Sequence, residues 1–186
     1  MVSFCTMSKP LKETTARVFF ALWPDKAERT ALAEWQAGLH EICGGRAMRA
    51  DTLHATLVFL GDVALHRLEA LQLAAQEVEG KSFDLSIDVA CYWGHNHIVY
   101  AATNIAPPQL EQLVHDLEQR LTEHRFRFDR RVYKPHITLL RHAQWRDTAL
   151  PDMRRVKWQA RSFALVQSAP DEQGANYRVL AKFPLL

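Results

Sequence analysis

The sequence predicts an α+β fold with antiparallel strands, and three observations support this prediction. The apolar positions indicate the element order β-α-β-α-β-β-α-β-β-β, in which several strands follow one another directly without regular βαβ alternation. The chain has 186 residues, 48% hydrophobic and 24% charged, which are the proportions of a globular protein that buries its own core. One short motif also occurs twice, in two of the predicted strands, and this indicates an internal duplication.

The N-terminal end is expected to be a disordered leader at residues 1–15, followed by a single domain at residues 16–186. The leader is mixed and polar and lacks the continuous apolar stretch of a secretory signal. Residues 17–22 form an apolar run typical of a strand. Residues 25–42 repeat apolar side chains at helical spacing, and the glycines at positions 44 and 45 favour the end of that helix.

The middle of the chain predicts two more strands and a helix before a hairpin partner. Residues 53–60 form an apolar run that predicts a buried strand ending at Gly61. Residues 65–78 carry apolar side chains on one helical stripe. Residues 83–89 alternate apolar and polar side chains, which indicates a half-buried strand, and residues 98–102 are its expected partner across a turn.

The C-terminal part predicts one helix and three strands. After the prolines at 107 and 108, residues 110–121 place leucines and valine on one stripe, as an amphipathic helix does. Short apolar runs at residues 137–140, 163–166 and 177–181 predict buried strands.

The cysteines and the hydropathy pattern bear on the compartment. Cys5, Cys43 and Cys91 are odd in number, widely spaced and without a C-x-x-C pair, which fits a reducing compartment better than a disulfide framework. Polar residues also interrupt every apolar run before the roughly 18 residues of a membrane span. We therefore expect a cytoplasmic protein without membrane association.

The charge is small overall but unevenly distributed. The formal net charge of +2 does not indicate a general polyanion binder. Residues 120–141, however, contain seven basic and two acidic side chains, whereas residues 62–90 contain six acidic and two basic ones. A local anionic partner is the expected consequence.

The repeated motif carries the functional prediction. The segment LHATL at residues 53–57 recurs as PHITL at residues 135–139, whereas nine His, ten Thr and 23 Leu predict only about 0.06 chance copies of His-x-Thr-Leu. Because strand side chains alternate between faces, His54 and Thr56 point the same way, and so do His136 and Thr138. Buried without partners, each such polar group would cost about 1 to 3 kcal/mol, so the wall of a polar cleft is their natural place.

Two histidines across a cleft suit general acid-base chemistry. The ordinary pKa of imidazole, near 6.5, lets one ring accept a proton while the other donates one, and neither step requires a metal. The threonine hydroxyls can donate hydrogen bonds to the oxygens of a bound phosphate. Cleavage of a phosphodiester is the reaction that uses both functions. The alternatives are two hydrogen-bonded core pairs, or an anion site without chemistry.

The two segments also resemble a known family. HATLVFLG at residues 54–61 and KPHITLLR at residues 134–141 look like the paired signatures of the two-histidine (2H) phosphoesterases, specifically the bacterial 2′-5′ RNA ligase or RNA 2′,3′-cyclic phosphodiesterase group. The likeness extends from Arg17 to about Leu180 and includes the opening RVFFA strand. It implies a bilobal, pseudo-symmetric fold in which two antiparallel sheets flank a central cleft, with helices packed outside.

The resemblance further implies an activity and residue roles. It implies metal-independent hydrolysis of RNA 2′,3′-cyclic phosphate ends to 2′-phosphates, with weak reversible 2′-5′ ligation of RNA ends. His54 would be the acid toward the 3′-oxygen, His136 the base toward water, and Thr56, Thr138 and Arg141 the phosphate contacts. Strict strand alternation points Arg141 away from His136, so this role requires the strand to bend or end near residue 140.

Further candidates surround the motif. No cofactor or metal is expected, because His95 and His97 lie in a predicted turn without a cysteine or carboxylate cluster. The candidates for the RNA approach are Arg130, Arg131 and Lys134, and the candidates for stacking on a base are Phe19, Phe20, Trp93 and Tyr133.

Two functional alternatives remain open from the sequence. One is a phosphodiesterase acting on a small cyclic phosphate, such as a nucleotide or an ADP-ribose derivative. The other is an RNA-end binding module without catalysis. The expected partner in the main interpretation is RNA with 2′,3′-cyclic phosphate ends, with no obligate protein partner.

Overall fold

The two copies of the repeated motif lie at the beginnings of two strands that are neighbours in the main sheet. The computed structural model describes residues 13–146, 149–171 and 174–186. Its eight-stranded antiparallel sheet has the order β10-β9-β1-β3-β7-β6-β5, with β2 paired to β7. One motif copy enters β3 (Ala55–Ala64) and the other begins β7 (His136–Arg141), and these two strands pair through Ala55 and Ile137 alone.

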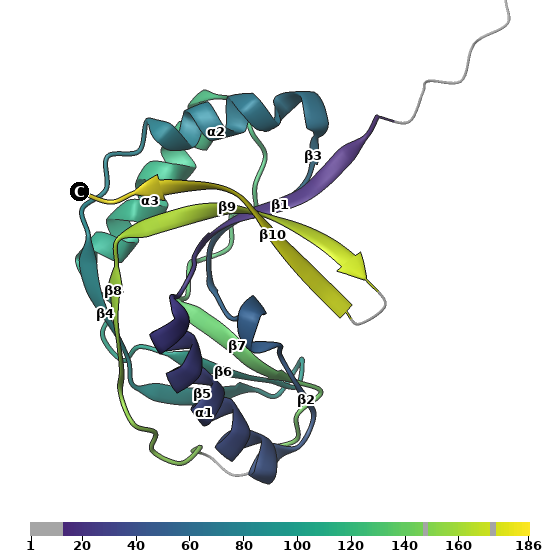
Figure 1. Ribbon diagram of the computed structural model, residues 1–186, viewed down its shortest axis with the longest axis vertical. Coiled ribbons are helices and arrows are strands. Elements are labelled where there is room, and N and C mark those ends of the chain that lie inside the picture. The colour runs from purple at the N-terminus through teal and green to yellow at the C-terminus, as the bar shows by residue number, and fades with distance from the viewer. Residues whose placement is uncertain (1–12, 147–148, 172–173) are drawn as a thin grey trace, which may run out of the picture.

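Because β3 and β7 share only that pairing, the sheet divides into two lobes (Figure 1). The predicted α+β class with antiparallel strands is confirmed, and the two predicted sheets are joined at this point into one hydrogen-bonded sheet. One lobe contains β1, β3, β9 and β10, and the other contains β2, β5, β6 and β7. The bounds of these strands are β1 Thr15–Leu22, β2 Arg46–Ala47, β5 Val89–Trp93, β6 Ile98–Ala102, β9 Ser162–Asp171 and β10 Gly174–Pro184.

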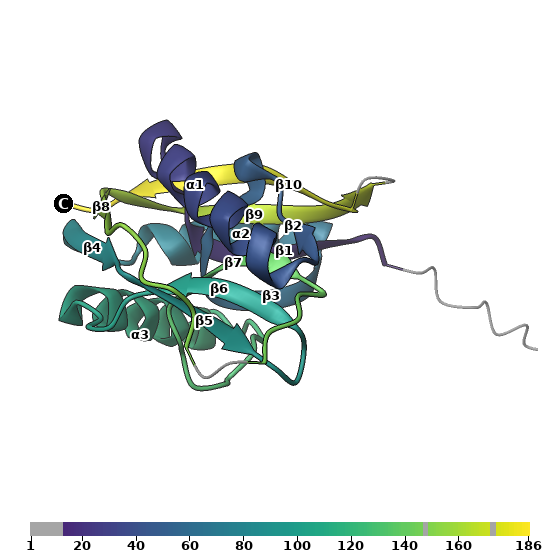
Figure 2. The same ribbon diagram turned by 90° about the horizontal axis from the view of Figure 1, so that it is seen from below.

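Two of the helices pack on the lobe other than the one that contains the strand before them. Helix α1 (Lys26–Cys43) follows β1 but packs against β7, whereas α3 (Pro108–Glu123) precedes β7 and packs against β3. Helix α2 (Leu68–Gln76) packs on α3 and β10. In Figure 2, α1 and α3 lie on opposite sides of the strands. This exchange of helices ties the two lobes together through a common core.

The predicted helical stripes form the buried faces of these helices except at two ends, where Ile42 is 46% and Leu65 is 45% exposed. In α1 the stripe contains Leu32, Trp35 and Leu39, each at most 2% exposed. The Trp35 indole N–H is also satisfied, because it donates to the carbonyl oxygen of Arg154 at 2.8 Å. In α3 the predicted stripe is buried along its whole length. Hydrophobic burial therefore fixes the orientation of both helices toward the sheet.

The strand predicted at residues 83–89 is wrong in extent, because two strands occupy this region. β4 (Phe83–Ile87) pairs with β8 (Val156–Ala160) in a separate two-stranded sheet, and β5 is the actual partner of β6. Asp88 separates the two strands, and its carboxylate accepts a hydrogen bond from the Asn104 backbone N–H at 2.9 Å. The alternation of apolar side chains continues across the break, which is why the pattern did not reveal it.

Three other boundaries differ from the prediction. β3 continues to Ala64, because Gly61 adopts a positive φ of 74° within the strand instead of ending it. The helix predicted at residues 65–78 begins with a 3-10 turn at Leu65–Arg67 before α2. Of the predicted leader, residues 1–12 lie outside the described residues, and Thr15 is already the first residue of β1.

Two observations bear on the compartment. Within the described ranges, no helix is long and apolar enough to cross a membrane. Cys43 is buried, Cys91 is half-buried, and both are free thiols; Cys5 lies outside the described residues.

Candidate active site

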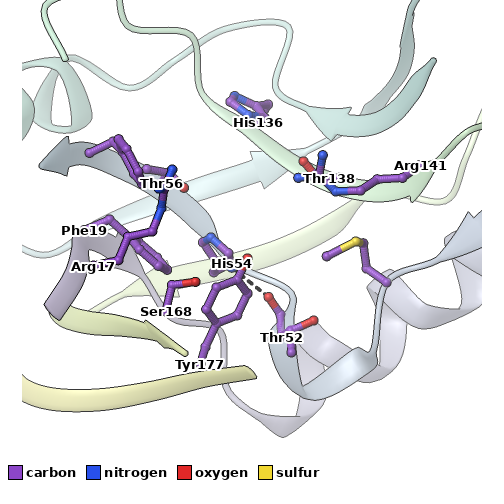
Figure 3. A pocket seen from close by; sticks show the side chains of 12 residues that line it. Arg17, Phe19, Thr52, His54, Thr56, His136, Thr138, Arg141, Ser168 and Tyr177 are labelled. Carbon is purple, nitrogen blue, oxygen red and sulfur yellow. Dashed lines mark hydrogen bonds between the residues drawn. The ribbon is translucent and has the colours of Figure 1, made fainter. Parts of the chain in front are cut away.

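Both motif copies line one cavity between the lobes. Its volume is about 280 Å³, and Figure 3 shows its side chains arriving from strands of both lobes. His54 and Thr56 come from the β3 side, and His136 and Thr138 come from β7. The rest of the lining consists of Arg17, Phe19, Met48, Thr52, Phe59, Arg141, Ser168 and Tyr177.

The two imidazoles are held in the same way. The Nδ1 of His54 lies 2.6 Å from the carbonyl oxygen of Thr52, and the Nδ1 of His136 lies 2.7 Å from that of Lys134. A carbonyl oxygen can only accept, so each Nδ1 carries the proton and donates it. Each Nε2 is therefore left as the nitrogen that can exchange a proton with a bound molecule.

The environment of the rings favours their neutral forms. Burial is the main cause that lowers the pKa of His54 to about 4, and the positive charges of His136 and Arg141 lower it further. Burial also lowers the pKa of His136, and Arg141 adds to the effect. In each case the hydrogen bond to the backbone carbonyl acts in the opposite direction. Once protonated, these rings are stronger acids than a solvated histidine.

Aromatic neighbours distinguish the two histidines. Phe19 and Trp23 stack on His54 with ring centroids 4.9 and 5.4 Å away, and Tyr177 meets its edge at 5.0 Å. His136 has edge contacts only, with Trp93 at 4.8 Å and Tyr100 at 5.9 Å. His54 is thus the ring held by stacking, in keeping with its strongly lowered pKa.

A β-bulge occurs at the same position in both motif copies. The register between β6 and β7 passes from Thr138 to Leu140, leaving Leu139 as the extra residue. The register between β1 and β3 passes from Thr56 to Val58 in the same way, leaving Leu57 as the extra residue. The duplication is therefore visible in the backbone as well as in the sequence.

The bulge decides where Arg141 points. Leu139 and Leu140 are consecutive residues and both are fully buried, so the alternation of faces is interrupted between them. Arg141 consequently returns to the face of His136 and lines the cavity. The strand bends as the phosphate role requires, and strict alternation is wrong here for this reason.

Glycine allows β2 to close against this end of β7. Gly45 has a φ of 85°, and a Cβ built on it would lie 2.6 Å from the carbonyl oxygen of Arg141. Any other residue would collide with backbone at this point. The backbone that carries Arg141 is therefore held closely by its neighbour.

The cavity has the composition of an anion site. Arg17 and Arg141 supply two cations, while Thr56, Thr138 and Ser168 supply hydroxyl groups. None of the described residues in the lining is acidic. Arg17 also lies over the ring of Phe59, with its guanidinium carbon 5.0 Å from the ring centroid. A bound phosphate would meet positive charge and hydrogen-bond donors on several sides.

The other predicted residues are distributed over different places. Phe20 is fully buried in the core and cannot meet a ligand. Arg130 lies over the Phe128 ring at 5.3 Å and lines a separate surface cavity. A second cavity beside His136 is lined by four of the predicted residues, namely Trp93, Arg131, Tyr133 and Lys134.

Several lining residues were not predicted from the sequence. Phe59 was recoverable, because it stands five residues after His54, as Arg141 stands five residues after His136. Arg17 was assigned only to the opening strand. Ser168 and Tyr177 lie on β9 and β10 without any local motif, and only the pairing of those strands beside β1 brings them to the cavity.

The described part of the chain contains no group of three His, Cys, Asp or Glu side chains close enough to hold a metal ion. His97 is engaged otherwise, because its Nδ1 lies 3.0 Å from the hydroxyl of Tyr92. The ring of His95 lies 6.5 Å from that of Trp93.

Comparison with known proteins places these features in a family context. The sequence profile of the family described as LigT-like phosphoesterase matches residues 22–100 and 104–177, and each segment contains one copy of His-x-Thr-Leu. The chain is 30% identical over 169 residues to the RNA 2′,3′-cyclic phosphodiesterase of Escherichia coli, covering 91% of this chain and 96% of that one. It is 29% identical to the protein of the same name from Thermus thermophilus, covering 91% and 90%.

The fold is also similar to a solved structure. The crystal structure of E. coli LigT in complex with 3′-AMP superposes with a TM-score of 0.82 at 29% identity. The match covers 92% of this chain and 99% of that one.

Proposed function

The chain belongs to the LigT-like phosphoesterase family, and from this premise we propose that it hydrolyses RNA 2′,3′-cyclic phosphate ends to 2′-phosphomonoesters. The observation that carries the proposal is the pair of equivalently held imidazoles, His54 and His136, in one cavity of anion-binding composition. The names of the relatives supply the substrate class, RNA with cyclic phosphate ends. The crystal structure of the E. coli protein in complex with 3′-AMP supports a nucleotide as the kind of ligand that this family binds.

The reaction needs a base on one side of the phosphorus and an acid on the other. Nε2 of His136 accepts a proton from water as the water oxygen attacks phosphorus. The bond from phosphorus to the 3′-oxygen breaks, and Nε2 of His54 donates its proton to that oxygen. The 2′-oxygen stays bonded, so the product is a 2′-phosphate with a free 3′-hydroxyl. This distribution of roles follows the family resemblance, and the lowered pKa of His54 makes its protonated ring a strong acid.

The remaining polar groups bind the phosphate. Thr56 and Thr138 donate hydrogen bonds to its non-bridging oxygens, and Arg141 holds them with its planar fork. Arg17 is a further cation of the lining. It lies in β1, in the lobe opposite to that of Arg141. As the pentacoordinate transition state gains negative charge, these donors stabilise it more than they stabilise the bound substrate.

Incubation with an oligonucleotide that carries a 2′,3′-cyclic phosphate tests the function directly. A 2′-phosphate product supports the proposal. A 3′-phosphate product would contradict it, because the 2′-oxygen would then be the leaving group. Turnover of a cyclic mononucleotide, or of an ADP-ribose derivative that carries a cyclic phosphate, but not of the oligonucleotide, would select the small-molecule phosphodiesterase. Binding without turnover would select the RNA-end module. Added RNA with a free 5′-hydroxyl reports on 2′-5′ ligation, in which that hydroxyl attacks the cyclic phosphate in place of water.

The pH dependence follows from the lowered pKa values. The reaction requires one protonated and one neutral ring, and both pKa values lie below the ordinary 6.5, that of His54 near 4. We expect kcat/KM to follow a bell with its maximum between about pH 4 and 6.5, whose limbs belong to the coupled pair. A bound phosphate anion stabilises the imidazolium form, so the kcat profile should lie at higher pH. A kcat/KM maximum above pH 7 would contradict this assignment.

Activity is expected to survive removal of metal ions. The described residues provide no cluster of three metal-ligating side chains, and the two imidazoles supply both proton transfers. Turnover should therefore be the same before and after dialysis against a strong chelator. Loss of turnover that added zinc or manganese restores would indicate metal-dependent catalysis instead.

The compartment completes the proposal. We place the protein in the cytoplasm, where its free thiols stay reduced and RNA ends are available.

A further inference from the structure

A second cavity of about 430 Å³ adjoins the catalytic one. The two cavities share Thr56, Phe59 and His136, so a ligand bound at the histidines can extend from one into the other. The catalytic cavity, at about 280 Å³, is at the lower limit of ordinary ligand sites and has room for about one nucleotide. Any further part of a longer substrate must lie outside it.

Part of the wall of the second cavity is aromatic and apolar. Trp93 lies at the end of β5, with its ring 4.1 Å from that of Tyr100 and 4.8 Å from that of His136. Tyr133 also lines this cavity; it is half-buried against the hydrophobic core, and its hydroxyl is fully covered. Val132 adds an aliphatic side chain that is 85% exposed. Such a surface suits the flat face of a nucleobase.

The charge of this wall suits a phosphate. Asp129 is paired with Arg131, which leaves Lys134 as the cation that forms no ion pair with any described residue. The backbone N–H of Asp129 also donates to the carbonyl oxygen of Phe59 at 2.8 Å, which fastens this loop to β3. The cavity wall is therefore held in place beside the catalytic strand.

We propose that the second cavity binds the nucleotide that precedes the cyclic phosphate in the RNA strand. Its base lies against Trp93 and Tyr133, and its phosphate faces Lys134. The proposal rests on the proposed function, because it assumes a cyclic phosphate between His54 and His136. The occupant belongs to the same RNA strand as the cyclic phosphate and not to a second molecule. Every RNA end carries such a preceding nucleotide, and this nucleotide brings a phosphate that can face Lys134.

The test compares two substrates with the same terminal base, a cyclic-phosphate dinucleotide and a cyclic mononucleotide. In the wild type, stacking of one base should make kcat/KM for the dinucleotide about 5- to 150-fold higher than kcat/KM for the mononucleotide. Val132→Glu places a negative charge in the second cavity and should bring this preference close to one. Because His136 borders both cavities, the readout is the ratio of the two kcat/KM values within each variant. Because Val132 is 85% exposed, the substitution leaves the core intact.

A matched control is Ile105→Glu. Ile105 is 84% exposed and lines neither cavity, so this variant should keep the full dinucleotide preference. A second pair varies the aromatic wall: Tyr133→Ala should reduce the preference, and Tyr133→Phe should retain it because the ring remains.

Three results would overturn the inference. The first is equal kcat/KM for both substrates in the wild type. The second is the same preference in Val132→Glu and Ile105→Glu. The third is formation of a 2′-5′ dinucleotide from the cyclic mononucleotide and a free nucleoside, lost in Val132→Glu, which would assign the cavity to an incoming alcohol from another strand. Failure of the wild type to turn over either substrate would refute the proposed function itself.

Discussion

Replacing either His54 or His136 by alanine is expected to reduce turnover of a 2′,3′-cyclic phosphate at least about 100-fold, the usual scale of general acid-base assistance. Each ring has a distinct proton to move, so neither can replace the other. The double variant should be little worse than either single one, because the two groups act in one step. The measurement is kcat with the cyclic-phosphate oligonucleotide at the pH optimum of each variant.

A control histidine makes this test specific. His115 is an exposed residue of α3 that lines a different cavity, and His115→Ala should keep wild-type turnover. Wild-type turnover in either His54→Ala or His136→Ala would disprove the two-histidine mechanism. Circular dichroism of each variant separates loss of chemistry from loss of fold.

The two roles can be told apart with a modified leaving group. In a substrate with sulfur in place of the 3′-oxygen, the leaving group is a thiolate. A thiolate is stable enough to leave without a proton from an acid. His54→Ala should regain much of its lost rate on this substrate, because only the acid becomes dispensable. His136→Ala should remain impaired. The reverse pattern would exchange the two assignments.

The fold could be predicted where hydrophobic burial alone defines an element. The leucine stripe of α3 and the apolar runs in β1 and β7 correspond to buried faces, so their period is visible in the sequence. The strands β4 and β5 were predicted as one strand because the alternation continues through Asp88. In the structure they pair with different strands, and the carboxylate of Asp88 accepts a hydrogen bond from the backbone N–H of the distant Asn104. Partners of that kind are properties of the tertiary structure, which a local pattern does not contain.

The candidate site could likewise be predicted only in part. The histidines and threonines were found because a duplicated motif marks them in the sequence. Ser168 and Tyr177 have no such mark, and they reach the cavity only because β9 and β10 extend the sheet beside β1. Bulges belong to the register between strands, so the direction of Arg141 could be decided only once β6 was paired with β7.

The duplicated halves differ at a position where the proposed mechanism needs a difference. Phe59 and Arg141 occupy equivalent positions after equivalent bulges, yet one is apolar and the other is a cation. Phe59 adds its ring beside Arg17, whereas Arg141 adds positive charge that acts on both histidines. A symmetric scaffold thereby holds two identical imidazoles in two electrostatic surroundings.

Replacing Arg141 by alanine is the second substitution with a large expected effect. The guanidinium can hold two phosphate oxygens with parallel hydrogen bonds, whereas a lysine ammonium supplies a point charge without that fork. Loss of such a charge-assisted contact costs about 1.5 to 3 kcal/mol, which corresponds to a roughly 10- to 150-fold lower kcat/KM. Arg141→Lys should retain part of the activity that Arg141→Ala loses.

The pH profile gives this prediction a second readout. The charge of Arg141 lowers the pKa of both histidines, so Arg141→Ala should move the bell of kcat/KM to higher pH. Arg141→Lys keeps a positive charge and should move the bell less. Thermal stability should be nearly unchanged in both variants, because the side chain faces the cavity. Wild-type kcat/KM and an unshifted bell in Arg141→Ala would remove Arg141 from the site and leave the phosphate to the threonines, the histidines and Arg17.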